Sequence, residues 1–276
     1  MRPLFAATVL LCACVVFAQG PKPEGRKELT EADKKSLSQE AKKWSAEASK
    51  LRKEGKLEEA IQAAEKMLAV EVRLYGELHD DPIGSLKQIA ACREQLEQFD
   101  QAKKIRERIV SLQTERFGKE DYRVTDAGLE VKNLELLQQL SPEERRQVAK
   151  AEGLNQRGLS IYQRDPKEAL PLWQEALEIR KKVLGENHLS YAESLNNLAH
   201  LLQSIGENAK AESLHLQALE IRKKVLGQNH PVYAGSLHNL ASLYQKVGQP
   251  AKAEPLRLQA LEIFKKVLGE NPPHYA

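Results

Sequence analysis

The apolar residues in the C-terminal part of this chain recur at helical spacing. One stripe runs from Ala192 to Leu202 at intervals of three and four residues, and Gly206 follows where a helix C-cap favours glycine. A second stripe runs from Ala211 to Val225. Each stripe covers one side of its helix, and neither helix buries it alone. The pattern therefore predicts two amphipathic helices, joined by a short turn, that pack on neighbouring pairs.

This two-helix unit repeats every 42 residues. The segment Lys-Lys-Val-Leu-Gly begins at Lys181 and returns at Lys223 and Lys265. Residues 188–229 and 230–271 are identical at 28 of 42 positions. Helix pairs that recur at a fixed spacing stack into an extended array. We therefore expect an all-α fold, an α-solenoid of stacked antiparallel helix pairs.

The repeats also carry motifs of a known family. The motifs are Tyr-Ala-x-Ser-Leu-x-Asn-Leu-Ala at 191–199 and 233–241, Ala-Lys-Ala-Glu-x-Leu at 209–214 and 251–256, and Gln-Ala-Leu-Glu-Ile at 217–221 and 259–263. By these motifs the chain resembles the tetratricopeptide repeats (TPR), in the 42-residue form of kinesin light chains and many bacterial repeat proteins. The resemblance implies a right-handed solenoid that binds proteins or peptides.

The same spacing extends upstream with more divergence. Gly76 and Gly118 are again 42 residues apart, but 67 residues separate Gly118 from Gly185. Ser141-Pro142-Glu143-Glu144 has the form of a capping box, so a helix starts afresh there. The predicted organisation is a signal peptide at 1–18, a flexible tether at 19–35, two divergent helix pairs at 36–118, an inserted helix (124–140) within 119–141, and three helix pairs at 142–276 with the next repeat truncated.

The N-terminus has the pattern of an export signal. After Arg2, an apolar stretch of about 14 residues ends at Phe17 and small residues precede Gln19; a membrane-spanning helix needs roughly 20. We therefore expect an exported protein, periplasmic or extracellular, with no integral membrane span, and the resemblance to bacterial repeat proteins implies a bacterial one. Leu11-Cys12-Ala13-Cys14 resembles a lipobox, which leaves lipoprotein anchoring at Cys14 as the alternative.

The charge pattern narrows the class of partner. The chain has 42 basic and 39 acidic residues, a formal net charge of +3, and the two signs are interspersed. Nucleic-acid binding needs a clustered basic surface, so we expect no nucleic-acid partner. The remaining partner class is protein or peptide.

The family resemblance also indicates where a peptide would bind. In this family the first helix of each pair lines the concave face, and amide side chains there donate to and accept from a peptide backbone. The corresponding peptide-binding positions are Asn155, Gln156, Asn196, Asn197, His200, Gln203, His238, Asn239, Ser242, Gln245 and Lys246. The alternative is that Asn197 and Asn239 bond to adjacent helices and fix the stacking.

We expect no catalytic, cofactor or metal site. His188 and His230 recur at the turn into each unit, but no second ligand lies at metal-binding spacing, which favours a capping role. Cys92 lies among alanines and is expected to be buried rather than nucleophilic. Motifs for nucleotide phosphates, catalytic serines and zinc hydrolases are not found in the sequence. These features predict that the chain is not an enzyme.

The C-terminal residues predict an incomplete further repeat. Residues 272–276 match the opening of another unit, and the helix at 250–268 is therefore expected to expose apolar surface. Either the open reading frame is a fragment of a longer one, or that face docks on a partner or a second copy. The predicted function is a non-catalytic scaffold that binds peptide segments or partner proteins. The alternative is a regulatory or sensor arm of a larger enzyme, such as a CHAT-type peptidase, whose effector domain is missing.

Overall fold

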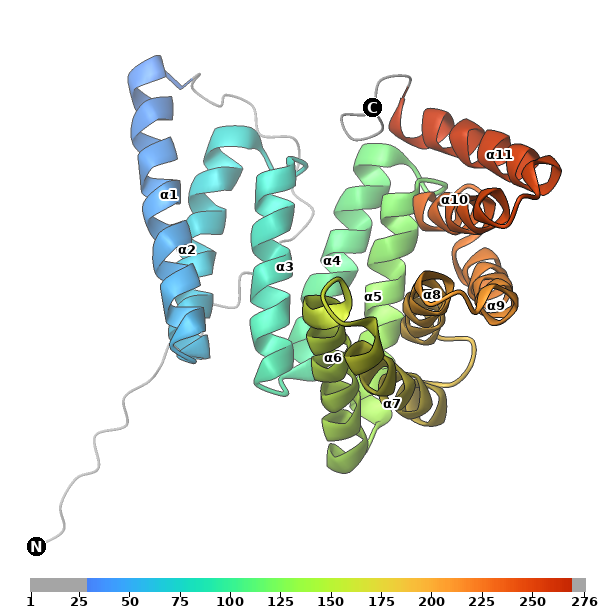
Figure 1. The fold of residues 1–276 in the computed structure, drawn as a ribbon. Coiled ribbons are helices and arrows are strands. Elements are labelled where there is room, and N and C mark those ends of the chain that lie inside the picture. Colours follow the sequence, from blue (N-terminus) through green and yellow to red (C-terminus); the bar gives the residue numbers. More distant parts are fainter. Residues whose placement is uncertain (1–28, 270–276) are drawn as a thin grey trace, which may run out of the picture.

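The computed structural model describes residues 29–269, and that part of the chain folds into α-helices joined by short turns (Figure 1). The helices are α1 (Glu31–Lys53), α2 (Leu57–Tyr75), α3 (Asp80–Gln95), α4 (Phe99–Phe117), α5 (Tyr122–Gln139), α6 (Pro142–Tyr162), α7 (Pro166–Leu184), α8 (Leu189–Ser204), α9 (Asn208–Leu226), α10 (Pro231–Lys246) and α11 (Pro250–Leu268). The fold is all-α, as the periodicity predicts. The expected signal at 1–18, the tether up to residue 28 and the repeat opening at 272–276 lie outside the described residues. The prediction of a tether as far as residue 35 is wrong, because the Thr30 side chain caps a helix that begins at Glu31.

The capping box predicted from the sequence is present at the start of α6. The Ser141 hydroxyl accepts a hydrogen bond from the backbone N–H of Glu144 (3.3 Å), and the Glu144 carboxylate accepts one from the backbone N–H of Ser141 (2.8 Å). These two bonds satisfy N–H groups that have no partner inside the helix. Pro142 follows at the first helical position, so a new helix begins directly after α5.

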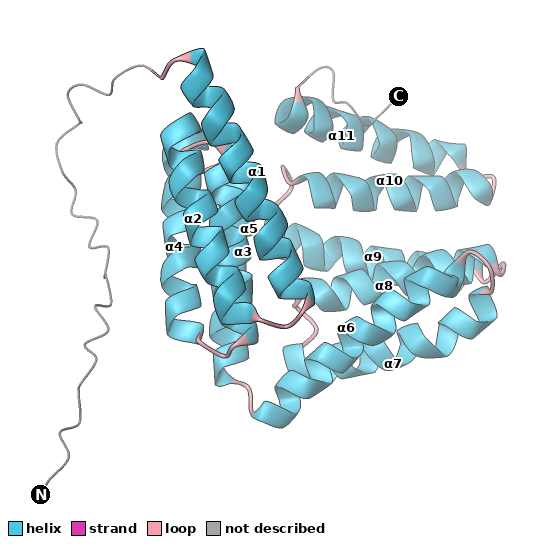
Figure 2. Cartoon of the chain, turned by 90° about the vertical axis from the view of Figure 1, so that its left-hand side faces the viewer, coloured by secondary structure: helices cyan, strands magenta, loops and turns pink. Residues whose placement is uncertain are grey.

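The helices form two blocks, α1–α5 and α6–α11. Within each block every helix packs against the next one along the chain, whereas α5 and α6 are joined by the turn at Leu140 and Ser141 without packing along each other. The helices of the first block stand upright in Figure 2, and α8–α11 of the second block run across them. The change of direction between α5 and α6 therefore separates one stack from the other.

Small residues allow the two helices of each pair to approach closely. Ala199 on α8 and Ala211 on α9 are both 0% exposed and share one core cluster with Leu240 and Ala241. At the equivalent crossing of α6 and α7, a Cβ atom added to Gly158 would lie 2.3 Å from Nε1 of Trp173. Packing this close is possible only with residues that have little or no side chain at the crossing.

The helix predicted over 124–140 is present as α5, which begins at Tyr122. Its N-cap is Asp121, 42 residues after His79, the N-cap of α3. In spacing, α5 thus continues the repeat of the first block as the first helix of a further pair. The next helix, α6, instead begins the second block.

Candidate functional site

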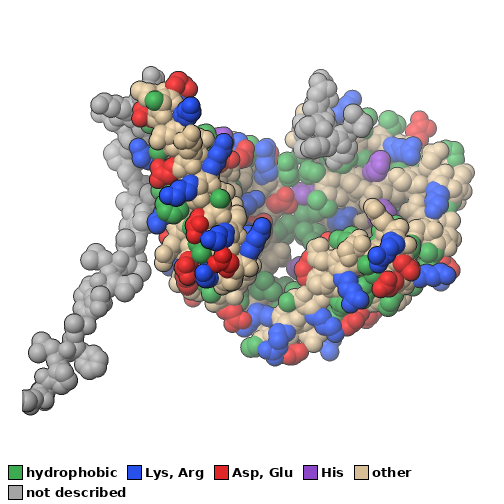
Figure 3. Space-filling view, turned by 60° about the vertical axis from the view of Figure 1, so that its left-hand side comes forward, with side chains coloured by type: hydrophobic (Ala, Val, Ile, Leu, Met, Phe, Trp, Pro, Cys, Tyr) green, Lys and Arg blue, Asp and Glu red, His purple; other side chains and the backbone are tan. Residues whose placement is uncertain are grey.

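The first helices of the three C-terminal pairs form one face of the second block. Side-chain hydrogen bonds join α6 to α8 and α8 to α10, whereas α7, α9 and α11 are the second helices of the pairs; in Figure 1, α8 lies nearer to α5 than the body of α9 does. We call the surface of α6, α8 and α10 the inner face. Figure 3 shows that the molecule is hollowed between the two blocks and that charged side chains of both signs are dispersed over the visible surface.

Amide side chains connect the helices of the inner face to one another. Nδ2 of Asn197 on α8 donates to Oδ1 of Asn155 on α6 (2.9 Å). In the next repeat, Nδ2 of Asn239 on α10 donates to Oδ1 of Asn196 on α8 (3.0 Å). These bonds give Asn197 and Asn239 the stacking role considered as the alternative to peptide binding.

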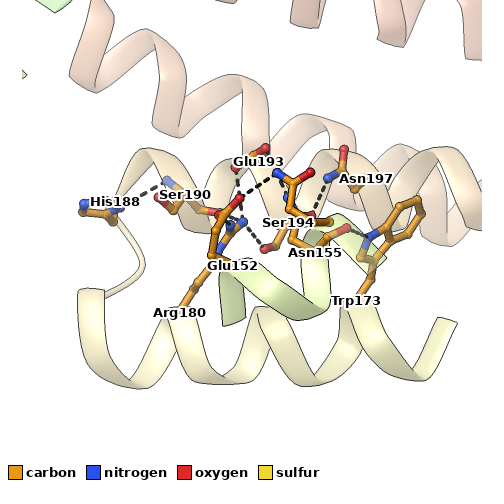
Figure 4. A network of polar contacts seen from close by, with 10 residues as sticks. Glu152, Asn155, Trp173, Arg180, His188, Ser190, Glu193, Ser194 and Asn197 are labelled. Carbon is orange, nitrogen blue, oxygen red and sulfur yellow. Dashed lines mark hydrogen bonds and ion pairs between the residues drawn. The ribbon is translucent and has the colours of Figure 1, made fainter. Parts of the chain in front are cut away.

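Asn155 is a correction to the expected peptide-binding set. Its side chain is 0% exposed, bonds to Asn197 and lies 3.5 Å from a Glu193 carboxylate oxygen, while its backbone carbonyl accepts a hydrogen bond from the Trp173 indole (3.3 Å; Figure 4). A buried amide needs such partners because an unpaired polar group costs free energy in the interior. Asn155 therefore holds α6, α7 and α8 together and is not available to a ligand.

The other predicted residues differ in exposure. Gln156, His238, Gln245 and Lys246 are exposed, and Asn196, Asn197, His200, Gln203, Asn239 and Ser242 are partly buried. Of the exposed residues, Gln156 donates to Glu152 within α6, and Lys246 donates to the backbone carbonyl of Gln203 (2.6 Å). The exposed predicted residues are thus concentrated on α10.

A buried arginine lies beneath the inner face between α6 and α8 (Figure 4). The side chain of Arg180, on α7, is 3% exposed, and Nη2 lies 2.7 Å from a Glu152 carboxylate oxygen. Nη1 donates to Ser194 Oγ (2.8 Å) and lies 3.2 Å from the Glu193 carboxylate. The guanidinium charge is therefore balanced by carboxylates of the helices on both sides.

The equivalent arginine one repeat later lines a cavity. Arg222, on α9, is 9% exposed and donates to Ser236 Oγ on α10 (2.6 Å). Burial lowers the pKa of Arg222, and the negative charge of Glu193 opposes this shift without cancelling it. The cavity has a volume of about 300 Å³ and is lined by Arg222, Val232, Gly235, His238, Asn239 and Phe264.

Two histidines meet inside the pair α8/α9. The rings of His200 and His215 pack edge to face with centroids 5.0 Å apart. Burial, followed by the neighbouring His200 and Arg222, lowers the pKa of His215 to about 4. Nε2 of His215 is buried without a hydrogen-bond partner in the structure. His215 is therefore neutral near pH 7, and His200 is less accessible to a ligand than its place on the first helix suggests.

His188 and His230 cap helices, as the sequence predicts. Nδ1 of His188 accepts from the backbone N–H of Ser190 (3.1 Å), and Nδ1 of His230 accepts from that of Val232 (3.2 Å). The other ring nitrogens make contacts that the repeat pattern does not indicate. Nε2 of His188 lies 3.1 Å from Oδ1 of Asn133, and Nε2 of His230 lies 3.1 Å from a carboxylate oxygen of Asp126, both on α5.

Three further features bear on function: the thiol of Cys92, clusters of potential metal ligands, and helices that could span a membrane. Cys92 is buried as expected, and burial raises the pKa of its thiol, which disfavours the nucleophilic thiolate. Within residues 29–269 no cluster of three or more potential metal ligands is found. Among the helices of that same range, none combines the length and apolar character needed to cross a membrane.

Comparison with solved structures returns repeat proteins of low sequence identity. A Podosopora anserina protein with nearly identical TPR-like repeats is 23% identical, with 84% of this chain and 97% of that chain covered and a TM-score of 0.35. BtubC from P. vanneervenii is 19% identical, with 91% and 96% covered and a TM-score of 0.37. YrrB, a TPR protein with an unusual peptide-binding site, is 18% identical, with 82% and 84% covered and a TM-score of 0.30.

Sequence comparison identifies the repeats of the second block. No curated protein matches the chain. The family model of the tetratricopeptide repeat matches residues 151–224 and 195–266, which together span α7–α10 and most of α6 and α11. The stacked antiparallel helix pairs of the structure agree with this match. Residues 151–266 are therefore tetratricopeptide repeats, and a role in protein interactions follows from these repeats.

Proposed function

We propose that the protein is a non-catalytic scaffold that binds a peptide segment or partner protein on the inner face, chiefly along α10. The observation that carries this proposal is the concentration of exposed polar groups there, at His238, Gln245 and Lys246, next to the cavity lined by Arg222. On α6 and α8, by contrast, several of the candidate side chains are occupied by contacts between helices. A partner would therefore find most of its accessible polar groups on α10.

We further propose that this binding takes place outside the cytoplasm. The support is the sequence of residues 1–18, in which an apolar stretch after Arg2 ends in small residues before Gln19. A solenoid suits such a location, because its stability comes from stacked apolar faces and does not depend on disulfides. Cys92 is the free thiol of the described chain and lies buried.

The test is a pull-down from envelope extract with residues 19–276 as bait. The first variant combines His238→Ala, Gln245→Ala and Lys246→Ala, which removes exposed side chains of α10. The matched control combines Gln217→Ala, Glu220→Ala and Lys223→Ala, which removes exposed side chains of α9 on the opposite side. Both variants leave the buried amides untouched, so both are expected to keep the helical circular dichroism of the unsubstituted chain.

The expected result is a partner that the control captures and the α10 variant loses. Because the substituted side chains are exposed, such a loss would be due to removed contacts rather than to unfolding. A partner captured equally by both variants would place the binding surface elsewhere and refute the assignment to the inner face.

A further inference from the structure

The helix α11 exposes two leucines on the side that faces away from the solenoid. Leu258 is 60% exposed and Leu261 is 49% exposed, the two highest values among the large hydrophobic residues of the described chain. They are three residues apart and therefore lie on the same side of the helix. Ala260 and Ile263, in contrast, are buried against α10. In Figure 2, α11 forms the end of the second block, beyond α10, so its outer side is apolar and uncovered.

The preceding repeats show which kind of element covers this side of a second helix. Leu177 on α7 and Leu219 on α9 are the counterparts of Leu261 at 42-residue spacing, and both are partly buried. Leu177 packs against the core cluster that contains Tyr191 of α8, and Leu219 packs against the one that contains Tyr233 of α10. In each case the first helix of the next pair covers the leucine. On α11 the same position is exposed.

The covering helix runs antiparallel to the helix that it covers. Tyr244, near the end of α10, donates a hydrogen bond to Glu212 near the start of α9 (2.8 Å). Tyr233, near the start of α10, lies in the cluster against which Leu219 packs, further along α9. The counterpart of Glu212 on α11 is Glu254, which is exposed. The outer side of α11 thus retains the apolar and acidic positions that receive an antiparallel helix one repeat earlier.

The exposed residues on the outer side of α11 complement a second copy of the same helix. Four exposed residues, which we call the outer stripe, follow at intervals of four, three and four: Glu254, Leu258, Leu261 and Lys265. This is the spacing of the seam between two packed helices. With a two-fold axis between residues 259 and 260, Leu258 lies opposite Leu261 of the second copy, and Glu254 lies opposite Lys265. A parallel pair would instead place like charges opposite each other.

The opposite end of the described chain offers no apolar counterpart to the outer stripe. The exposed side chains of α1 are polar or charged, apart from alanines, and none of the exposed large hydrophobic residues of the described chain lies on α1. A polar outer helix of this kind keeps the end of a solenoid soluble. A head-to-tail contact between two copies would therefore place the leucines of α11 against charged groups of α1. A second α11 is the better match.

We propose that the outer stripe is a dimer interface, on which the α11 of a second copy packs antiparallel about a two-fold axis. Such an interface uses the same residues on both copies. The proposal goes beyond the proposed function, because the partner-binding residues of the inner face lie on α10. A dimer carries two inner faces and can hold a partner with two binding segments more tightly than one copy does. Because one helix pair is a small interface, we expect a dissociation constant on the order of 10 µM.

The first test is sedimentation velocity of residues 19–276, the chain of the pull-down, from about 1 to about 500 µM. The unsubstituted chain should show a monomer–dimer equilibrium. Leu258→Ser combined with Leu261→Ser removes the apolar centre of the outer stripe and should weaken dimerisation roughly tenfold or more. The matched control, Leu159→Ser combined with Leu216→Ser, replaces two exposed leucines of α6 and α9 and should dimerise as the unsubstituted chain does.

Three outcomes of this test would overturn the proposal. The first is a chain that stays monomeric over the whole concentration range, and the second is a dimer that the α11 variant forms as well as the control does. The third is growth beyond the dimer, which would indicate a head-to-tail contact. If the chain is monomeric and the α11 variant loses a protein that the control captures in the pull-down, a different protein covers the outer stripe and self-association is refuted.

The second test reverses the charges at the ends of the outer stripe. In the antiparallel dimer, Glu254→Lys places lysines opposite each other and Lys265→Glu places glutamates opposite each other. Either variant alone should dimerise roughly fivefold more weakly than the unsubstituted chain, because two ion pairs become two repulsions. An equimolar mixture of the two variants should recover the dimer, since every lysine then faces a glutamate.

The combined variant Glu254→Lys with Lys265→Glu restores both ion pairs and should dimerise as the unsubstituted chain does. The substituted side chains are exposed, so all three variants are expected to keep the helical circular dichroism of the chain. Dimerisation that is unaffected by the single reversals, or that fails to recover in the mixture and in the combined variant, would overturn the antiparallel packing of α11 on α11.

Discussion

Nε2 of His230, the N-cap of α10, lies 3.1 Å from a carboxylate oxygen of Asp126 on α5, although 104 residues separate the two. His188, the N-cap of α8, makes the equivalent contact with Asn133. Asp126 and Asn133 are seven residues apart, about 10 Å along a helix, which is close to the distance between packed helices. α5 therefore lies across the ends of two successive repeats and joins the first block to the second.

Replacing His230 should separate its two roles. Asn caps helices well, so His230→Asn is expected to keep the cap of α10 and to lose the contact with Asp126. We predict faster amide hydrogen exchange in α5 and a loss of about 1 kcal/mol in the free energy of unfolding. His79→Asn, at the corresponding cap of α3, is the control and should leave exchange in α5 unchanged. Unaltered exchange in α5 of the His230 variant would show that this contact does not hold the blocks together.

Gly158 should not tolerate even a methyl group. A Cβ at this position would lie 2.3 Å from the Trp173 indole, which is 2% exposed. We predict that Gly158→Ala destabilises the chain by about 1–3 kcal/mol, measured by urea unfolding. Gly153→Ala, at an exposed position of the same helix with no atom nearby, is the control and should be neutral or stabilising because alanine favours helix. Similar unfolding curves for the two variants would contradict the packing described.

The buried amide of α6 should matter more than the half-buried one of α8. Asn155→Ala removes the acceptor of Asn197 inside a fully buried site, and we predict a loss of about 1–3 kcal/mol in unfolding free energy. Asn196→Ala removes the acceptor of Asn239, but both of those side chains reach solvent, so its effect should be smaller. Equal effects in denaturant unfolding would mean that burial does not set the strength of these bonds.

The stability of the chain should fall in mild acid because of His215. The pKa of histidine is about 6.5 in an unfolded chain, while that of His215 in the folded chain is lowered to about 4 by burial. Between these values the unfolded chain binds the additional proton, so the stabilisation present above pH 6.5 is lost as the pH falls toward 4. The loss attributable to this residue is at most about 3 kcal/mol.

The measurement is urea unfolding at pH 7 and at pH 4.5 for the unsubstituted chain and for His215→Gln. The variant should lose less stability between the two pH values, because glutamine does not titrate. Leu216→Ala is the control, since Leu216 is an exposed, non-titrating neighbour on the same helix and its replacement should leave the pH dependence as it was. An unchanged pH dependence in His215→Gln would refute the role of that residue.

The sequence alone determined the helices, their pairing and the family. Those features follow from local patterns: apolar residues at three- and four-residue intervals, caps such as Ser141 and His188, and a repeat copied at 42 residues. The difference between Arg180 and Arg222 is also visible there, because aligning the repeats sets Gly235 opposite Glu193. What the alignment does not show is the space beside Arg222.

The tertiary structure decided which polar residues a partner can reach. Asn155 and Asn196 occupy the same repeat position, yet the first is fully buried and the second is not, because each side chain is covered by different neighbours in the stack. The position of α5 could likewise not be predicted from the sequence, since Asp126 and Asn133 belong to no recognisable motif. They contact His230 and His188 only because the chain changes direction at Ser141. Burial and long-range contact depend on how whole helices pack, and periodicity along the chain specifies only which side of each helix packs.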